Sequence, residues 1–234
     1  DAVFISHFHS DHVHDLLPIG KMLMSAMTSF DPATGEVGFA QGRRIPLIVP
    51  AGAAETLERF AALFPVTTQP WLDQPFSLAF DIVEHDPAYD LEIGGVRISL
   101  TELRHVATNH AIRLDDGRHS LVYSGDTGPT PALADFARDA DALLVENTLI
   151  DSDRSEHGHL STAEAARAAA EAGVGRLILT HYLNTPTYPS EWRAQEAAAH
   201  YDGPIDLAAP DAVYDIPARL ESATAASSST LSEV

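Results

Sequence analysis

The chain of 234 residues contains no cysteine, which excludes a disulfide framework, a thiolate metal site and a cysteine nucleophile. Basic residues are scarce as well: 14 Lys and Arg stand against 34 Asp and Glu, which gives a formal net charge of −20. Because an acidic surface repels phosphate backbones, we expect no nucleic-acid partner. No stretch approaches the roughly 18 uninterrupted apolar residues of a membrane span. The sequence therefore predicts a soluble, cytoplasmic protein with no membrane partner.

Predicted strands and helices alternate along the chain, which is typical of a layered α/β fold. The predicted strands cover residues 3–6, 46–49, 96–102, 120–124, 142–146 and 176–180. The predicted helices cover residues 53–63, 131–138, 162–172 and 191–200. Glycine-containing turns at 93–96 and 115–118 predict hairpins, so part of the sheet is antiparallel. Residues 16–45 are expected to form a long loop. We expect one domain over 1–216 and a disordered Ser- and Ala-rich tail over 217–234.

The clearest local feature is the segment His7-Phe8-His9-Ser10-Asp11-His12, which directly follows a hydrophobic strand. Residues two apart on an extended segment point the same way, so His7 and His9 can bind one ion together. A turn after them can carry Asp11 and His12 towards a second ion. Imidazole and carboxylate ligands suit Zn²⁺, and also Mn²⁺ or Fe²⁺. The alternative interpretation is a solvent-exposed, histidine-rich turn.

Three more predicted strands are each followed by a ligand-type residue, namely His105, Asp126 and His181. In layered α/β folds, ligands gather where strands end. With the first segment these residues supply seven ligands, which is the number that a two-metal site needs. The remaining histidines fit surface positions or positions behind the ligands: His14, His85, His110, His119, His157 and His200. The pair Arg43–Arg44 could meet an anionic substrate, although a solvated basic pair is the favoured interpretation.

The order of these motifs resembles the metallo-β-lactamase fold superfamily. The motifs are H-x-H-x-D-H, then a histidine, then a Gly-Asp-Thr-Gly turn at 125–128, and finally Leu179-Thr180-His181. Within the superfamily, the chain is most similar to ribonuclease Z-like and arylsulfatase-like metallohydrolases. Glu146 and the segment 158–162 fit that branch. The resemblance implies an αββα four-layer sandwich.

The resemblance also implies a binuclear site. It puts one ion on His7, His9 and His105 and a second on Asp11, His12 and His181, with Asp126 bridging the two. It makes His159 a non-ligand histidine that stabilises the transition state or protonates the leaving group, and puts Glu146 beside the site. The expected catalytic residues are Asp11, Asp126, Glu146 and His159.

The implied activity is attack by a metal-bridged hydroxide on a small anionic ester, most favourably a phosphodiester, with two Zn²⁺ as cofactors. A sulfate ester or a lactone is the alternative substrate for the same site. A non-catalytic metal-binding scaffold is the alternative from a different class. A homodimer is compatible with the sequence.

Some features depart from the family pattern. Relatives carry opening strands before the H-x-H-x-D-H segment, so we expect an N-terminally incomplete first sheet. His105 and Asp126 are only 21 positions apart (126 − 105), too few for a tRNA-gripping arm. Lactone hydrolases of the superfamily have a Tyr after the bridging Asp, where this chain has Thr127. A small anionic ester is therefore the expected partner rather than a folded RNA.

Overall fold

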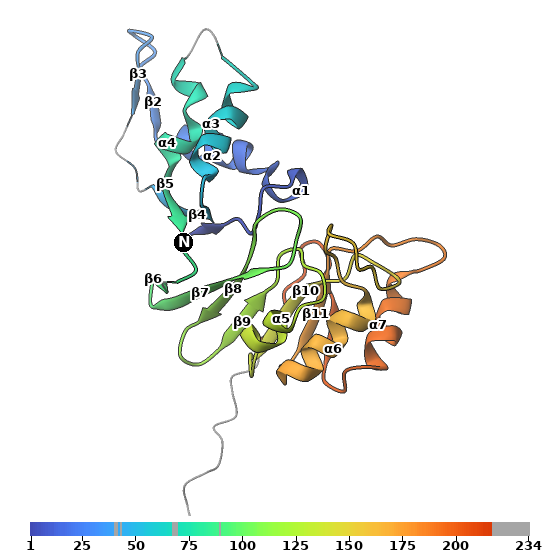
Figure 1. Ribbon diagram of the computed structural model, residues 1–234. Helices are drawn as coiled ribbons and strands as arrows, with labels where there is room; N and C mark the ends of the chain where they lie inside the picture. The colour runs from blue at the N-terminus through green and yellow to red at the C-terminus, as the bar shows by residue number, and fades with distance from the viewer. Residues whose placement is uncertain (40–41, 43, 67–69, 89, 217–234) are drawn as a thin grey trace, which may run out of the picture.

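The computed structural model describes residues 1–39, 42, 44–66, 70–88 and 90–216 of the chain. It has four layers: helices, a three-stranded sheet, a seven-stranded sheet and a second set of helices (Figure 1). The αββα architecture expected from the sequence is thus confirmed. The predicted tail at 217–234 lies outside the described residues. In the described part of the chain, no helix has both the length and the apolar character needed to cross a membrane.

The smaller sheet is entirely parallel. Its strands, in spatial order, are β1 (Val3–Phe4), β4 (Ile45–Pro50) and β5 (Phe80–His85). The elements that cover its outer face are α2 (Leu16–Ala26), α3 (Ala53–Ala62), the 3₁₀ turn η1 (Pro70–Asp73) and α4 (Pro75–Ala79). Side chains of β4 alternate between the layers, as strand geometry requires. Leu47 and Val49 pack against the helices, whereas Ile48 packs against the larger sheet.

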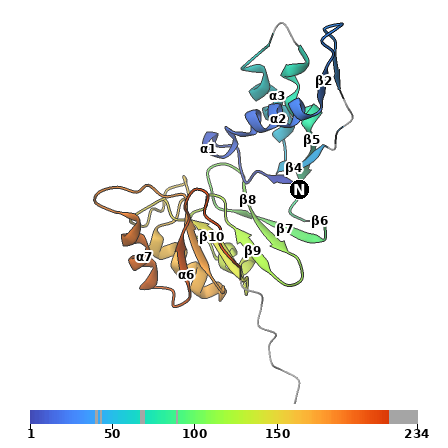
Figure 2. The same ribbon diagram turned by 180° about the vertical axis from the view of Figure 1, so that it is seen from behind.

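The larger sheet has a parallel half and an antiparallel half. Its strands, in spatial order, are β12 (Ile205–Leu207), β11 (Leu177–Thr180), β10 (Ala142–Glu146), β9 (Ser120–Tyr123), β8 (Asn109–Asp115), β7 (Val96–Leu103) and β6 (Leu91–Ile93). The helices on its outer face are α5 (Pro131–Phe136), α6 (Thr162–Ala172) and α7 (Ser190–Ala198) (Figure 1); Figure 2 shows α6 and α7 from behind. Strands β9 to β12 run parallel, and β6 to β9 form antiparallel pairs.

Between the two sheets lies a small apolar layer that includes Ile48, Ile98 and Ile112. His85 at the end of β5 and His110 in β8 meet at one side of it, with ring centroids 5.3 Å apart. Each is 4% exposed, and burial lowers the pKa of both imidazoles. Of the two positions expected for these histidines, the surface and a place behind the ligands, burial excludes the surface for His85 and His110.

The segment 16–45 differs most from its prediction. Instead of a long loop it forms helix α2 and a hairpin of β2 (Thr28–Phe30) with β3 (Val37–Phe39). Leu16, Leu17 and Met24 share one buried helical face, and Pro18 is tolerated because it lies in the first turn. Arg44 directly precedes β4 and pairs with Asp81 of β5 at 2.7 Å, and Arg43 lies outside the described residues.

Helix α6 begins and ends where the sequence predicts, at 162 and 172. Ser161 and Glu164 form a capping box at its start, and Gly173 ends it with φ 66°. The helix begins three residues after His159, so its cap fixes the end of the loop that carries His159.

Candidate metal centre

The predicted site residues come together at one edge of the sandwich. His7 follows β1, His105 follows β7, Asp126 follows β9, Glu146 ends β10 and His181 follows β11. The last four of these strands run in the same direction in the larger sheet, so their carboxyl ends meet at the same edge. This is the expected position of a ligand site in a layered α/β fold.

The segment after β1 supplies ligands in two directions. His9 has extended backbone angles, φ −80° and ψ 153°, and directly precedes the four-residue helix α1 (Ser10–Val13). The predicted turn after His9 is therefore present, and it is helical. It places the Oδ2 of Asp11 3.5 Å from the Nε2 of His12, whose ring lies 4.1 Å from that of His7.

Three imidazoles form a compact set that we call the first-ion group: His7, His9 and His105. The Nε2 of His7 lies 3.0 Å from the Nδ1 of His9, which lies 3.1 Å from the Nε2 of His105. Ligand nitrogens about 2.0–2.1 Å from one tetrahedral zinc ion lie roughly 3.3 Å from each other. The three nitrogens thus have the mutual spacing of ligands to a single ion. Asp126 joins the set, with its Oδ2 3.7 Å from the Nε2 of His7.

A second set, which we call the second-ion group, consists of Asp11, His12 and His181. The Oδ2 of Asp11 lies 3.2 Å from the Nε2 of His181 and 3.5 Å from the Nε2 of His12. Asp126 also reaches this set: its Oδ1 lies 3.4 Å from His12, and its Oδ2 lies 3.6 Å from His181. The carboxylate of Asp126 therefore faces both groups, which is the position of a bridging ligand.

The opposite ring nitrogens of three of these histidines have protein partners. The Nδ1 of His7 lies 3.1 Å from the hydroxyl of Ser6, and the Nδ1–H of His105 donates to the carbonyl of Gly158 at 2.9 Å. The Nδ1 of His181 lies 2.8 Å from the hydroxyl of Thr148. Such contacts fix the tautomer and orientation of metal-binding imidazoles. In each of these three rings, Nε2 is the nitrogen that faces the other ligands of its ion group.

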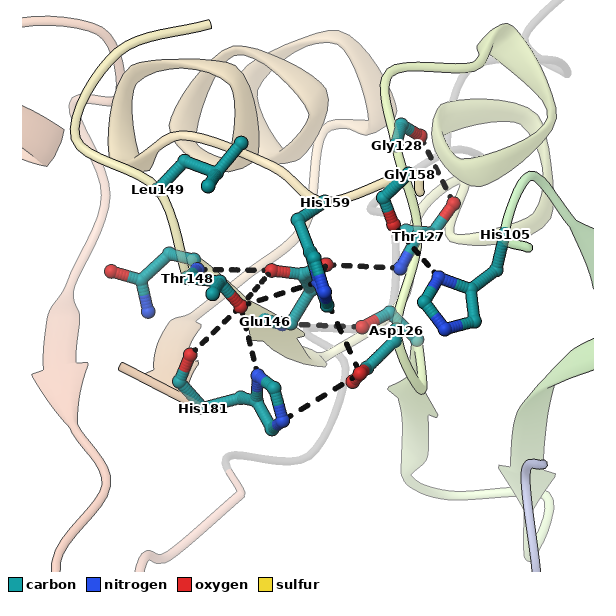
Figure 3. A network of polar contacts seen from close by, with 12 residues as sticks. His105, Asp126, Thr127, Gly128, Glu146, Thr148, Leu149, Gly158, His159 and His181 are labelled. Carbon is teal, nitrogen blue, oxygen red and sulfur yellow. Dashed lines mark hydrogen bonds and ion pairs between the residues drawn. The ribbon is translucent and has the colours of Figure 1, made fainter. Parts of the chain in front are cut away.

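Glu146 links the second-ion group to His159 (Figure 3). Its Oε2 accepts from the hydroxyl of Thr148 at 2.7 Å, so Thr148 must accept in turn from the Nδ1–H of His181. Its Oε1 accepts from the Nδ1–H of His159 at 2.8 Å and from the backbone N–H of Thr127 at 3.0 Å. The carboxylate is 1% exposed, and these bonds satisfy its two oxygens in place of water. A continuous chain of hydrogen bonds therefore runs from His181 to His159.

Backbone conformation fixes two of the ligands. Gly125 has φ 59°, and a Cβ there would lie 2.2 Å from the side-chain oxygen of Asn109. Only glycine therefore fits the turn that presents Asp126. His181 has φ 55°, a strained conformation for a non-glycine residue. It turns the chain at the end of β11 so that the ring faces Asp126.

The charges of the site are strongly coupled. Burial, together with the charge of His12, lowers the pKa of His7 to about 3. Burial also acts to lower the pKa of His12, but the adjacent carboxylate of Asp126 outweighs it and raises that pKa. Burial acts to raise the pKa of Asp126, but the adjacent imidazole of His12 and the charge of His181 lower it to about 2. The carboxylate is thus held in the ionised form that a metal ligand needs.

Comparison with known proteins agrees with this geometry. The family described as the beta-lactamase superfamily domain matches residues 1–182. The chain belongs to the metallo-β-lactamase superfamily. The probable metallo-hydrolase YhfI of Bacillus subtilis is 28% identical over 209 residues, which cover 89% of this chain and 75% of that protein. A ribonuclease Z of Mycobacterium bovis is 30% identical over 227 residues, which cover 88% of this chain and 76% of that protein.

The solved structure of YhfI, a metallo-β-lactamase fold protein, matches with a TM-score of 0.70 at 25% identity, and the match covers 89% of this chain and 74% of that one. The chain is thus a hydrolase of the metallo-β-lactamase superfamily, whose fold implies divalent metal binding. Some relatives are named ribonuclease Z, which does not clearly fit the expectation that nucleic acid is not a partner. That expectation rests on the net charge of −20 and remains a prediction.

All the residues predicted for the site lie within it. The His and Asp residues form three groups whose ligand atoms lie within 4.8 Å of one another: His7, His9, His105 and Asp126; Asp11, His12 and His181; and Asp126, His159 and His181. The last group puts His159 within the same reach of Asp126 and His181. Its Nδ1 lies 3.9 Å from Asp126 and 2.8 Å from Glu146, so Glu146 is the nearer partner. The role of each residue remains a prediction.

Sequence reasoning missed Thr148 and Arg193. Arg193 in α7 is 1% exposed, and its guanidinium donates to the backbone carbonyl of Asn147 and, at 3.0 Å, to the hydroxyl of Thr162. It also lies 5.1 Å over the ring of Tyr182. The buried cation thus holds the loop that carries Thr148 next to the chain that follows His181. No sequence signal marks either residue, because both act through neighbours that only the sheet brings together.

Proposed function

We propose that the chain is a binuclear metal-dependent hydrolase of small anionic esters, most favourably phosphodiesters. The observation that carries the proposal is the position of Asp126, whose two carboxylate oxygens face two separate sets of ligand-type side chains. One carboxylate shared by two ligand sets is the arrangement that a two-metal site requires.

The residues present fit such ions. The Nε2 of His12 and the Oδ1 of Asp126 are both buried, 3.4 Å apart, and neither forms a hydrogen bond within the described part of the chain. Buried polar atoms without a partner are costly, and a cation between them would satisfy both. Imidazole and carboxylate donors without a thiolate suit Zn²⁺, and also Mn²⁺ or Fe²⁺. We therefore assign two divalent ions, one to each group, with Zn²⁺ favoured.

Two divalent ions, when bound, supply an activated water nucleophile and stabilise the negative charge that develops on the ester oxygens. The protein contributes the proton for the leaving group. The hydrogen bond from His159 to Glu146 raises the pKa of that imidazole. Because this bond uses Nδ1, Nε2 is the nitrogen that can give a proton to the leaving oxygen.

Glu146 serves as a positioning residue in this proposal. It accepts from His159 on one oxygen and from Thr148 on the other, so the acid and a ligand of the second-ion group share one support. Any shift of Glu146 would therefore move both the ring of His159 and, through Thr148, the ring of His181. The proposal therefore assigns proton transfer to His159 and orientation to Glu146.

The preference for a small substrate rests on the connection between His105 and Asp126 and on the net charge. That connection is the hairpin of β8 and β9 with a short turn at Asp116, and it carries no inserted arm. The net charge of −20 disfavours a long polyanion. Relatives named ribonuclease Z, and a fold neighbour named as a diphosphatase, support a phosphorus ester as the substrate class.

Metal analysis and a substrate panel test the proposal. The purified chain should bind close to two zinc or manganese ions and should hydrolyse bis-p-nitrophenyl phosphate faster than p-nitrophenyl sulfate, a lactone or a precursor tRNA. Absence of bound metal would overturn the site. Turnover of only the sulfate ester, the lactone or the tRNA would overturn the substrate class while leaving the site intact.

A further inference from the structure

A second histidine from the same loop faces the metal centre. The ring of His157 is exposed to solvent and lies next to His159, with ring centroids 4.8 Å apart. It also lies 5.7 Å from the ring of His105 and 6.4 Å from that of His9. His157 therefore lies beside two members of the first-ion group, at a position that the sequence assigns to the surface or to a place behind the ligands.

The two loop histidines have different neighbours in the site. The ring of His159 lies between the two groups, 5.3 Å from that of His105 and 5.8 Å from that of His181. The ring of His157 lies beside the first-ion group, next to His105 and His9. The two rings lie 4.8 Å apart, and Gly158, between them in the chain, accepts a hydrogen bond from His105 (Figure 3).

The backbone that carries His157 is fixed, although its ring is exposed. Its carbonyl accepts from the N–H of Val106 at 3.2 Å, and the carbonyl of Gly158 accepts from His105 at 2.9 Å. Gly158 has φ 79°, and a Cβ there would lie 2.7 Å from the carbonyl oxygen of Arg104. Only glycine therefore allows this close approach between the loop and the strand end.

The guanidinium of Arg104 also holds the loop that carries His157, because it donates a hydrogen bond to the backbone carbonyl of Arg154 at 3.2 Å. The ring of His157 is exposed and has no hydrogen bond to another described residue, so a ring N–H is available to a ligand. The loop thus presents a free donor at a defined place beside the first-ion group.

We propose that His157 contacts the substrate and donates a hydrogen bond to a non-leaving oxygen of a tetrahedral oxyanion centre, as in a phosphoryl or sulfuryl ester. The inference rests on the proposed function and names its substrate class more closely. A tetrahedral phosphoryl or sulfuryl centre carries charged non-bridging oxygens besides its leaving oxygen, so His157 can donate to one of them while His159 serves the leaving oxygen. A planar acyl ester or lactone has a single uncharged carbonyl oxygen instead. A neutral imidazole N–H is a sufficient donor.

The test compares His157→Ala with His157→Asn, which keeps an N–H donor, and with His119→Ala, a half-buried histidine in the β8–β9 turn. Binding of inorganic phosphate to the metal-loaded protein is measured by calorimetry, alongside kcat and KM for bis-p-nitrophenyl phosphate. We expect His157→Ala to weaken phosphate binding and to raise KM by about tenfold to a hundredfold, because it removes a hydrogen bond to a charged group. The number of bound ions should stay the same, kcat should change little, and His157→Asn should restore most of the affinity.

Unchanged phosphate affinity in His157→Ala would overturn the inference, as would loss of bound metal or absence of phosphate binding by the unaltered chain. An equal effect on hydrolysis of a lactone would overturn the selection of a tetrahedral centre. The two proposals fail separately. A chain that binds phosphate through His157 but hydrolyses no ester would disprove only the proposed function. A chain that hydrolyses phosphodiesters equally well without His157 would disprove only this inference.

Discussion

The first-ion and second-ion groups bring similar ligands together by different structural means. His7 is fully buried and lies three residues after β1, a strand of the smaller sheet. In the second-ion group, the side chain of Asp11 is 60% exposed and that of His181 is 28% exposed. Asp11 belongs to a helix of four residues, and His181 adopts a left-handed conformation.

The difference concerns preorganisation. In the first-ion group, burial holds the ring of His7 and the hydrogen bond to Gly158 holds that of His105, so these two rings have little conformational freedom to lose when an ion binds. In the second-ion group, an exposed carboxylate on a short helix must lose side-chain entropy upon binding. We therefore expect the first-ion group to bind its ion more tightly. The predictions below test this difference, beginning with the residue that both groups share.

Replacement of the shared ligand should have the largest effect. Asp126→Ala removes the one carboxylate that faces both groups and leaves His7 and His12 close together without a neutralising charge. We expect fewer than two bound ions by metal analysis and phosphodiesterase activity below detection. Asp202→Ala, at an exposed aspartate, is the control and should leave both measurements unchanged. Full activity of Asp126→Ala would disprove the shared site.

Replacement of one strand-end histidine in each group distinguishes the two metal-binding steps. His105→Ala should remove the tighter of two metal-binding steps, and His181→Ala should remove the weaker step and keep the tighter. Both rings have an Nδ1 partner, so the two variants lose comparable supporting contacts. Stepwise removal of ions with a chelator, followed by metal analysis, distinguishes the two outcomes. Two equal affinities in the unaltered chain would mean that burial does not set the order.

The proposed acid should affect the rate and not the metal content. His159→Ala is expected to lower kcat by about 10²- to 10⁴-fold, the usual contribution of a general acid, with two ions still bound. Substrates with a good leaving group, such as p-nitrophenolate, should suffer least because they need less protonation. Loss of an ion in this variant would instead make His159 a ligand, as its distance of 3.9 Å from Asp126 allows.

The hydroxyl partners of the ligands should have smaller effects, and these too should differ between the groups. Thr148→Val removes the hydroxyl between His181 and Glu146, and we expect a loss of about 10- to 100-fold in affinity for the weaker ion or in activity. Ser6→Ala is the matched change in the first-ion group, and it should have less effect because burial also holds His7. Chelator titration of both variants measures the difference. A larger loss in Ser6→Ala would contradict the argument.

The residues of the site were predictable because the ligand-type residues occur in short sequence segments that can be recognised without knowledge of the fold. His7, His9 and His12 occur in one short segment, and His105, Asp126 and His181 each follow a recognisable strand. The layered fold then brings strand ends together without further information. Helix α6 was predictable for the same reason, because its cap and its terminal glycine are local signals.

The supporting contacts were not predictable because they depend on strand order. Thr148 reaches His181 only because β10 and β11 are neighbours, with Glu146 opposite Thr180. Likewise, the sequence does not place His157 near the site, because its position depends on the hydrogen bond from His105 to Gly158. Helix α2 was missed because its Met, Gly and Pro residues weaken the local helical signal, whereas burial of Leu16 and Met24 stabilises it in the fold.

Acidification should also act on the two groups in sequence. In the metal-free protein, burial holds the pKa of His7 at about 3, whereas the charge of Asp126 raises the pKa of His12 despite burial. The charged form of His12 therefore stabilises the fold below the ordinary histidine pKa of about 6.5, and this contribution is lost as the pH rises through the raised value. For His7 the sign is opposite: its contribution is present above about 6.5 and is lost as the pH falls towards 3.

Protons therefore compete with the ion for His12 at a higher pH than for His7. When the metal-loaded chain is dialysed at steps from neutral to acidic pH, bound metal should fall from two ions to a plateau at one, and only then to none. The ion of the second-ion group leaves first, so His181→Ala should begin at the plateau and lose its single ion in the lower pH range. Loss of both ions in one step would show that Asp126 couples the groups too strongly for either to hold an ion alone.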